Sequence, residues 1–323
     1  MKIGLFTVLF QNLTTPEMIE KVSNLGIEAI ELGTGNFPGD AHCQVDELLN
    51  SETAREQFLN KLRDANIEIS GLSCQGNPIH PDSTIASTHH EILEKTILLA
   101  KKLGISVVNC FSGCPGDHEN ARHPNWITCA WPAEYAEIRE WQWEHSIVPY
   151  WKKQAKFAED YGVKIALEMH PGFAVYNPET LMELRKRTGS TNIGANFDPS
   201  HLIWQGIDPV VAIKYLGSEQ AIFHFHAKDT YLDRSNINVN GVLDTKDYRR
   251  GLERAWTFRT VGYGMSESMW KNMLSALSMV NYTGVLSIEH EDQYASIEEG
   301  LARALEFLKR IRFQEKPTEM WWA

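Results

Sequence analysis

Four side chains that can bind a metal ion or carry a proton stand at the ends of four short apolar segments. Glu168, Asp198, His226 and Glu289 follow the segments 164–167, 193–197, 221–225 and 285–288, respectively. Three carboxylates in one poorly solvated pocket repel one another, and each is costly to bury unless a cation or strong donors stabilise it. If the fold brings these four side chains together, the sequence therefore predicts a divalent metal site.

The chemistry of such a site follows from its ligands. A set made mostly of oxygen atoms favours Mn²⁺, with Mg²⁺, Co²⁺ and Zn²⁺ as alternatives, and water or substrate oxygens would complete about six ligands. A cation with open positions can polarise a sugar carbonyl so that the neighbouring C–H becomes acidic. We expect Glu168 or Glu289 to remove that proton, and the resulting enediolate to be stabilised electrostatically.

An alternation of strands and helices must bring the four side chains together. The hydrophobic pattern predicts strands at 2–10, 28–32, 68–72, 107–111, 164–169, 193–197, 221–226 and 284–289, and helices at 15–25, 45–65, 83–103, 134–161, 178–187, 209–216, 266–280 and 296–311. Strands separated by helices run parallel, and eight such units close into a barrel whose strand ends meet at one mouth. We therefore predict an α/β fold, a single (β/α)₈ TIM barrel domain spanning residues 1–323.

Two long connections interrupt this alternation, at 112–132 after strand four and at 231–264 after strand seven. Loops after barrel strands surround the mouth, so both are predicted to be lids or walls of the site, with partner binding or disorder as the alternative. The aromatic residues of 256–264 could stack on a sugar ring or an aglycone, and Arg259 could bind an anionic substrate group. A packed lid would need neither contact.

Further candidates lie close to the four predicted ligands. His224 and His226 alternate with phenylalanines, so both point into the barrel; His226 is nearer the mouth, and His224 is placed beneath it, contacting a ligand or the substrate. His201 follows Asp198 by three residues and can turn toward the same site, although a helix cap is the alternative for Asp198. Lys228 is predicted either to contact substrate or to pair with Asp229.

The order of these motifs resembles the xylose isomerase-like sugar (phosphate) isomerase/epimerase superfamily. The resemblance rests on Glu168, Asp198-x-x-His201, His224-x-His226-x-Lys228-Asp229 and Glu289, and it covers nearly the whole chain. It implies that Glu168, Asp198, His226 and Glu289 bind Mn²⁺ or a similar ion and that both glutamates serve as acid and base. His201 would contact substrate or orient the site.

The sequence also departs from the ketose epimerases of that superfamily. Those enzymes follow the ligand histidine with Gly-Glu and an arginine that contacts substrate, whereas Ala227, Lys228 and Asp229 stand here. Their free-ketose pocket is therefore not reproduced, and the resemblance extends the candidate substrates from ketoses to inososes and 3-keto-glycosides. Epimerisation or isomerisation is the predicted reaction, with elimination by a lyase or dehydratase as the alternative.

The sequence also bears on two other functions, a nuclease and a non-catalytic sugar-binding subunit. Endonuclease IV, a zinc nuclease, is also similar at the later strand ends, but it adds histidines on strands three and four, where this chain has Cys74-Gln75 and Asn109-Cys110. The net charge of −11, from 31 basic and 42 acidic residues, also opposes binding to nucleic acid. A non-catalytic sugar-binding subunit would lack a base or a ligand, and neither is missing.

The remaining features bear on location and partners. Five cysteines without paired spacing indicate reduced thiols and a cytoplasmic protein, and no segment is apolar enough to enter a membrane. Cys110, Cys114, His118 and His123 form an alternative zinc site, although their spacing matches no standard finger. The tail 320–323 carries two tryptophans, which we expect to be covered either by a second subunit or by the chain's own barrel.

Overall fold

A closed barrel of eight parallel strands forms the centre of the computed structural model, which describes residues 1–315 and 318–322. Around the barrel the order is β1-β10-β7-β6-β5-β4-β3-β2. The strands are β1 (Lys2–Phe6), β2 (Ala29–Gly33), β3 (Glu68–Ser73), β4 (Val107–Cys110), β5 (Lys164–Glu168), β6 (Ile193–Phe197), β7 (Ile222–Ala227) and β10 (Val285–Ile288). The predicted (β/α)₈ barrel is confirmed.

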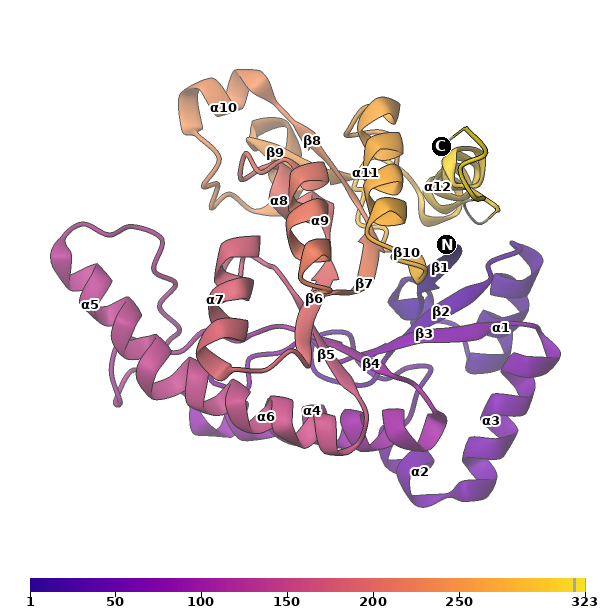
Figure 1. The fold of residues 1–323 in the computed structure, drawn as a ribbon, viewed down its shortest axis with the longest axis horizontal. Helices are drawn as coiled ribbons and strands as arrows, with labels where there is room; N and C mark the ends of the chain where they lie inside the picture. The colour runs from indigo at the N-terminus through magenta and orange to yellow at the C-terminus, as the bar shows by residue number, and fades with distance from the viewer. Residues whose placement is uncertain (316–317, 323) are drawn as a thin grey trace.

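Helices form the outer layer of the molecule (Figure 1). They are α1 (Thr15–Asn24), α2 (Val45–Asn50), α3 (Glu52–Asp64), α4 (Ser83–Leu103), α5 (Ala133–Gln142), α6 (Val148–Asp160), α7 (Pro178–Thr188), α8 (Pro199–Ile203), α9 (Pro209–Ser218), α11 (Glu267–Met279) and α12 (Ile297–Ile311). Trp151 of α6 and Trp270 of α11 are fully buried between this layer and the barrel, where apolar side chains form the core.

Two predicted helices are divided in the structure. The helix predicted at 45–65 is interrupted at Ser51, whose backbone is extended and whose hydroxyl accepts the N–H of Ala54 to begin α3. The helix predicted at 134–161 contains a π-helical turn, η2 (Trp143–Ile147), directly before α6. Pro149 lies in the first turn of α6 and has no N–H to donate, which favours a break in the regular pattern at this point.

The long connection after β7 is an ordered insertion and not a plain loop. It contains the antiparallel strands β8 (Asp229–Leu232) and β9 (Trp256–Arg259), the helix α10 (Arg234–Asn240) and the 3₁₀ helix η3 (Tyr248–Glu253). Another 3₁₀ helix, η1 (Thr7–Phe10), replaces the end of the strand predicted at 2–10. In Figure 1, β8 continues from the end of β7 and carries α10 to the edge of the molecule, away from the barrel.

Two irregularities in the barrel occur at polar residues that face inward. The register between β2 and β3 shifts between Ile30 and Glu31, and the register between β6 and β7 shifts between Ala195 and Asn196. An extra residue in one strand re-aims the side chains that follow it. The extra residues are Ser70 of β3 and Phe223 of β7, so the second shift re-aims His224, which follows Phe223.

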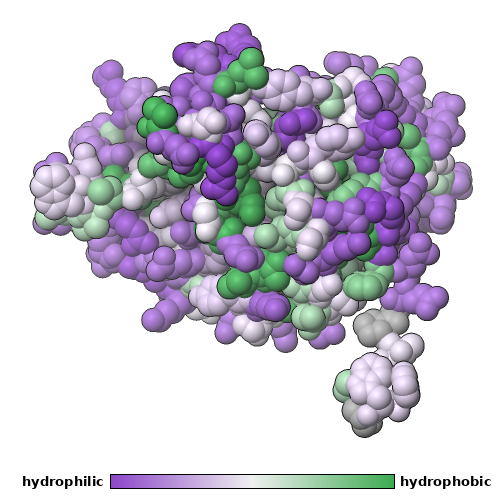
Figure 2. Space-filling model, turned by 90° about the horizontal axis from the view of Figure 1, so that it is seen from above, coloured by the Kyte–Doolittle hydropathy of each residue, from purple (hydrophilic) through white to green (hydrophobic). Residues whose placement is uncertain are grey.

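The described part of the C-terminal tail stands off the body of the molecule (Figure 2). Trp321 and Trp322 are 87% and 69% exposed. The alternative in which the barrel itself covers both indoles is therefore not observed, while Ala323 lies outside the described residues. A covering subunit stays a prediction.

Candidate active site

The four predicted ligands converge at one end of the barrel. Glu168 is the last residue of β5, Asp198 and Glu289 directly follow β6 and β10, and His226 is the penultimate residue of β7. These strands are neighbours in the order β10-β7-β6-β5, so the side chains form an arc with Glu168 and Glu289 at its two ends. One ligand atom from each residue lies within 4.8 Å of the others.

Several buried polar atoms on this arc have no hydrogen-bond partner among the described residues. They are Asp198 Oδ2, His226 Nδ1 and, beside them, Nε2 of His201. The His201 nitrogen lies 3.2 Å from Glu168 Oε1 and 3.3 Å from Asp198 Oδ2. Buried polar groups are normally paired, so this cluster of unpaired carboxylate and imidazole atoms fits a divalent cation.

Asp198 caps a helix with one carboxylate oxygen and leaves the other facing the arc. Its Oδ1 accepts the N–H of Ser200 at 2.8 Å and begins the short helix α8, as expected of a helix cap. Its Oδ2 is not used by the cap and faces the arc. The helix cap therefore fixes the direction of the other oxygen.

The ring of His226 is held from behind by a carboxylate. Its Nε2 lies 3.0 Å from both oxygens of Glu31, and its Nδ1 faces the arc, 3.1 Å from Glu289 Oε2 and 3.7 Å from Glu168 Oε2. A proton on Nε2, donated to Glu31, leaves the Nδ1 lone pair directed at the arc, the arrangement typical of metal-binding histidines. Burial lowers the pKa of His226, but Glu31 and Glu289 raise it well above its usual value.

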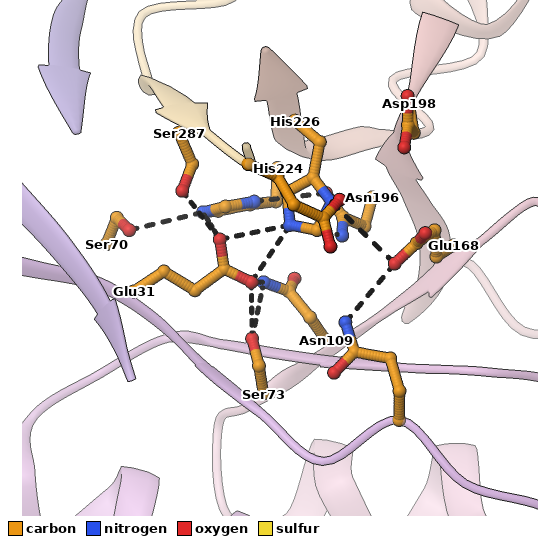
Figure 3. Close-up of polar contacts among 12 residues, drawn as sticks. Glu31, Ser70, Ser73, Asn109, Glu168, Asn196, Asp198, His224, His226 and Ser287 are labelled. Carbon is orange, nitrogen blue, oxygen red and sulfur yellow. Dashed lines mark hydrogen bonds and ion pairs between the residues drawn. The ribbon is translucent and has the colours of Figure 1, made fainter. Parts of the chain in front are cut away.

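Glu31 belongs to a buried network that the sequence analysis missed (Figure 3). Besides His226, it accepts hydrogen bonds from Ser73 and Ser287 and from Asn109 at 3.0 Å. Burial raises the pKa of Glu31, but His226 and His224 and these hydrogen bonds outweigh it and lower the pKa to about 2. A signal was available in the sequence, since Glu31 is an acidic residue inside an apolar strand segment.

His224 lies in the layer beneath, as predicted, but the structure does not bring it to the cavity. Its Nδ1 lies 3.0 Å from Asn196 Oδ1, and its Nε2 lies 3.2 Å from Ser70 Oγ (Figure 3). The Asn196 amide nitrogen in turn lies 3.1 Å from His226 Nε2. Its predicted contact with a ligand or the substrate stays a prediction; in the structure Asn196 lies between His224 and His226.

A cavity of about 610 Å³ opens next to the arc. It is lined by Phe6, Val8, Phe37, Pro38, Gln75, Phe111, Glu168, His170, Lys228, Tyr248, Phe258, Glu289 and Glu291. Gln75, which the sequence analysis did not select, donates to Glu168 Oε2 at 3.2 Å. The lining combines aromatic walls with a few polar groups near the arc, as ligand sites commonly do.

Lys228 lines the cavity, but its predicted pairing with Asp229 is wrong. Its Nζ lies 3.2 Å from Glu289 Oε2 and 2.6 Å from Glu291 Oε2, and 4.2 Å from the ring centroid of Phe258. Asp229 instead accepts hydrogen bonds from the backbone of 262–265 and from the indole of Trp270. Lys228 lies between β7 and β8 and Asp229 begins β8, and the two residues face different partners.

Arg259 is not at the cavity, and its predicted role in binding substrate is corrected. Its Nε donates to Asp292 at 3.1 Å, and its guanidinium lies over the ring of Tyr294. Asp292 also accepts the N–H and hydroxyl of Thr260. Arg259 thus joins β9 to the loop after β10.

The two glutamates at the ends of the arc have different electrostatic environments. Burial raises the pKa of Glu168 above its ordinary value even though His226 lies nearby. Burial also acts to raise the pKa of Glu289, but the nearby Lys228 and His226 outweigh burial, so the pKa of Glu289 is lowered. Burial lowers the pKa of His201 to about 4, so this imidazole is neutral near pH 7.

A family model described as the xylose isomerase-like TIM barrel matches residues 19–311. The chain belongs to this family. The uncharacterized protein YfiH of Bacillus subtilis (strain 168) is 40% identical over 313 residues, covering 96% of this chain and 99% of that protein. An inosose dehydratase of Clostridium tetani is 29% identical over 167 residues, about half of each chain (51% and 51%).

Solved structures of other proteins share the fold. The IolI protein, solved with a bound zinc atom, superposes with a TM-score of 0.67 at 19% identity, covering 98% of this chain and 100% of that one. The probable 3-DHS dehydratase AsbF of Bacillus anthracis superposes with a TM-score of 0.64 at 18% identity, covering 96% and 99%. Structures of a D-psicose 3-epimerase and of a probable dehydratase thus share the fold of this chain.

The alternative zinc site is not formed in the part of the chain that the structure describes. Cys110 and Cys114 are buried, whereas His118 is exposed and contacts Asp117. The groups of potential metal ligands found in residues 1–315 and 318–322 are the arc and the cluster of Glu31, His224 and His226, neither of which includes a cysteine. None of the helices described combines the length and apolar character that a bilayer crossing requires.

Proposed function

We propose that this chain is a divalent metal-dependent isomerase or epimerase that moves a proton next to the carbonyl of a sugar-derived ketone. The observation that carries the proposal is the arc of Glu168, Asp198, His226 and Glu289, with unpaired buried atoms beside an aromatic-walled cavity. Mn²⁺ is the proposed ion because oxygen ligands predominate, and the zinc in the IolI structure supports a divalent cation in this family without deciding its identity.

A bound divalent ion would orient the substrate oxygens and polarise the carbonyl. Glu168 and Glu289 approach from opposite ends of the arc. One glutamate can therefore remove a proton from a substrate carbon, and the other can return a proton to it. His201 lies against both Glu168 and Asp198 and can donate to a substrate oxygen once its proton is on the nitrogen facing the cavity. Lys228 adds a positive charge beside Glu289.

The proposed substrates are a ketose, an inosose or a 3-keto-glycoside. Removal of the proton next to the carbonyl is common to all three, and the position to which a proton returns separates epimerisation from isomerisation. A second candidate is dehydration, in which a neighbouring hydroxyl leaves as water after the same first step. Two similarities support dehydration as this second candidate. The chain is similar in sequence to an inosose dehydratase over half its length, and it is similar in fold to AsbF.

Solvent deuterium exchange tests the proposal directly. Purified protein with added Mn²⁺ would be incubated in D₂O with panels of ketoses, inososes and 3-keto-glucosides, and each substrate followed by NMR. We expect deuterium at the carbon next to the carbonyl of at least one substrate, lost with excess chelator. An unsaturated product identifies dehydration, and no exchange in any panel with metal-loaded protein contradicts the proposal.

A further inference from the structure

The charged side chains around the candidate active site are unevenly balanced. The residues that line the cavity include three glutamates, Glu168, Glu289 and Glu291, whereas Lys228 is the only lysine or arginine among them. A smaller pocket of about 220 Å³ shares two lining residues with the cavity, and its lining contains Asp244 but no lysine or arginine. Within the described residues, Lys228 is therefore the one lysine or arginine that lines either space.

This single cation is already engaged by acidic partners. The Lys228 side chain is 3% exposed, and its Nζ lies 2.6 Å from Glu291 Oε2 and 3.2 Å from Glu289 Oε2. The ring of Phe258 covers it, with the centroid 4.2 Å from Nζ. A buried ammonium that contacts two carboxylates has little charge left to offer to an anionic ligand.

Glu291 faces the cavity from its rim. Its side chain is 49% exposed, in contrast to the buried Lys228 that it contacts. Half-exposed ion pairs add little stability, and Lys228 already has a partner in Glu289. A charge at the entrance of a binding site, however, strongly affects which ligands can enter it. Selection of ligands is therefore a better explanation of Glu291 than stability.

The insertion after β7 holds this pair in place. Phe258 belongs to β9, and its neighbour Arg259 donates to Asp292, the neighbour of Glu291, at 3.1 Å. Asp292 also accepts the N–H and the hydroxyl of Thr260. The backbone that carries Glu291 is thereby tied to the strand that covers Lys228.

The charge around the cavity would stay negative even with a divalent ion bound. The arc has three carboxylates, and Glu291 adds a fourth negative charge. One divalent ion and Lys228 would supply three positive charges against these four. A phosphate monoester brings a further charge of about −1.5 to −2 at pH 7 into a poorly solvated space, where like charges repel one another strongly.

We infer that Glu291 is a specificity-determining residue that occupies Lys228 and repels anionic groups, so that the site accepts an uncharged sugar-derived ketone and rejects its phosphate ester. The identity of the ligand as a reacting ketone rests on the proposed function. The selection against negative charge rests on Lys228 and its two carboxylate partners.

Glu291→Gln tests the selection by removing one charge with little change of shape. Lys228 keeps Glu289 as its partner but gains an uncompensated side toward the cavity. Glu253→Gln is the matched control, because Glu253 is 56% exposed on the insertion and lines neither the cavity nor the smaller pocket. A double variant, Glu291→Gln with Lys228→Gln, removes both charges of the pair. Circular dichroism would compare the folding of all variants with that of the unmodified protein.

Binding would be measured without turnover. Fructose, fructose 1-phosphate, fructose 6-phosphate and ribulose 5-phosphate would be titrated calorimetrically into each protein, with and without bound Mn²⁺. We expect Glu291→Gln to bind at least one sugar phosphate about ten-fold more tightly than the unmodified protein does, and neither the control nor the double variant to show this gain. No gain in Glu291→Gln, an equal gain in Glu253→Gln, or a gain that persists in the double variant overturns the inference.

Deuterium exchange then separates the two proposals. For a ketone that exchanges and for its phosphate ester, we expect kcat/KM of the unmodified protein to favour the uncharged form by about 100-fold, and Glu291→Gln to reduce this preference about ten-fold. Exchange that is equal or faster with the phosphate ester contradicts the selection while supporting the proposed function. Absence of exchange for every substrate contradicts the proposed function, while the binding result still decides the selection.

Discussion

The two halves of the barrel contribute different kinds of polar residue to its centre. Strands β5, β6, β7 and β10 supply the arc, whose residues lie at strand ends and leave buried atoms without partners. Strands β2, β3 and β4 supply Glu31, Ser73 and Asn109, which lie within the strands and bond to one another. Both oxygens of Glu31 accept hydrogen bonds, so this buried carboxylate is saturated.

This difference separates groups that can react from groups that orient them. A carboxylate with every lone pair directed at protein donors has nothing left for a ligand, whereas an unpaired one beside a cavity does. Under the proposed function, Glu31 would act through His226 and the arc would act directly. Changes in the two halves should consequently have different effects on activity and on metal affinity.

The largest effect is expected from Glu168→Gln in the arc. The amide has the same shape but cannot take up a proton, so exchange with solvent deuterium should fall about 10³-fold. Gln75 can still contact residue 168, and the circular dichroism spectrum should be unchanged. Undiminished exchange in a folded variant would remove Glu168 from the acid/base role.

His226→Gln should chiefly weaken metal binding. The glutamine amide can still reach Glu31, but it lacks the Nδ1 lone pair that faces Glu289 and Glu168. We expect the affinity for Mn²⁺ or Zn²⁺, measured by isothermal titration calorimetry, to fall more than about 100-fold, beyond what loss of a supporting contact causes. Unchanged affinity would mean that His226 is not a ligand.

Glu31→Gln tests the supporting half of the barrel. Loss of the charge behind His226 should lower metal affinity by about 10- to 100-fold, less than loss of the ligand itself. Glu47→Gln, at an exposed position of α2, is the matched control and should have no effect. If Glu31→Gln weakens metal binding as much as His226→Gln or more, the distinction between the two halves fails.

The smallest effect is expected for chemical labelling of the cysteines. Four cysteines in the half of the barrel that contains β2, β3 and β4 are buried, whereas Cys129 is exposed. Burial raises the pKa of the Cys43 and Cys74 thiols to about 12. At pH 8 only about one in 10⁴ of such thiols is ionised, and the thiolate is the reactive form. Alkylation of native protein at pH 8 should label Cys129 rapidly and the other thiols only after denaturation. Rapid labelling of several thiols in the native protein would show that this half of the barrel opens to solvent.

The arc was predictable from the sequence because its signals are local. Each ligand ends an apolar strand, and the rule that parallel strand ends meet at one mouth brings them together without knowledge of any contact. Helix signals were equally local, as at Asp82, which caps α4, and at Gly104, which ends it with a left-handed backbone.

The supporting residues and the partners of Lys228 and Arg259 were not predictable in the same way. Glu31 meets Ser287 and His226 across the barrel, more than 190 positions away in sequence. The partners of Lys228 and Arg259 lie in the loop after β10. The sequence suggested Asp229 as the partner of Lys228 and an anionic substrate group as the partner of Arg259, and the tertiary structure gives both residues other partners.

The double use of Asp198 restricts position 198 more than any other on the arc. Asparagine could begin α8 but would not carry the negative charge, and glutamate would carry the charge on a stem too long to keep the short contact with the N–H of Ser200. Because α8 leads directly into Trp204, which stacks on Trp256, an altered start of this helix would be transmitted to the insertion after β7. One side chain thereby couples the arc to the packing of the insertion, and a mutational scan should find position 198 the least permissive of the four.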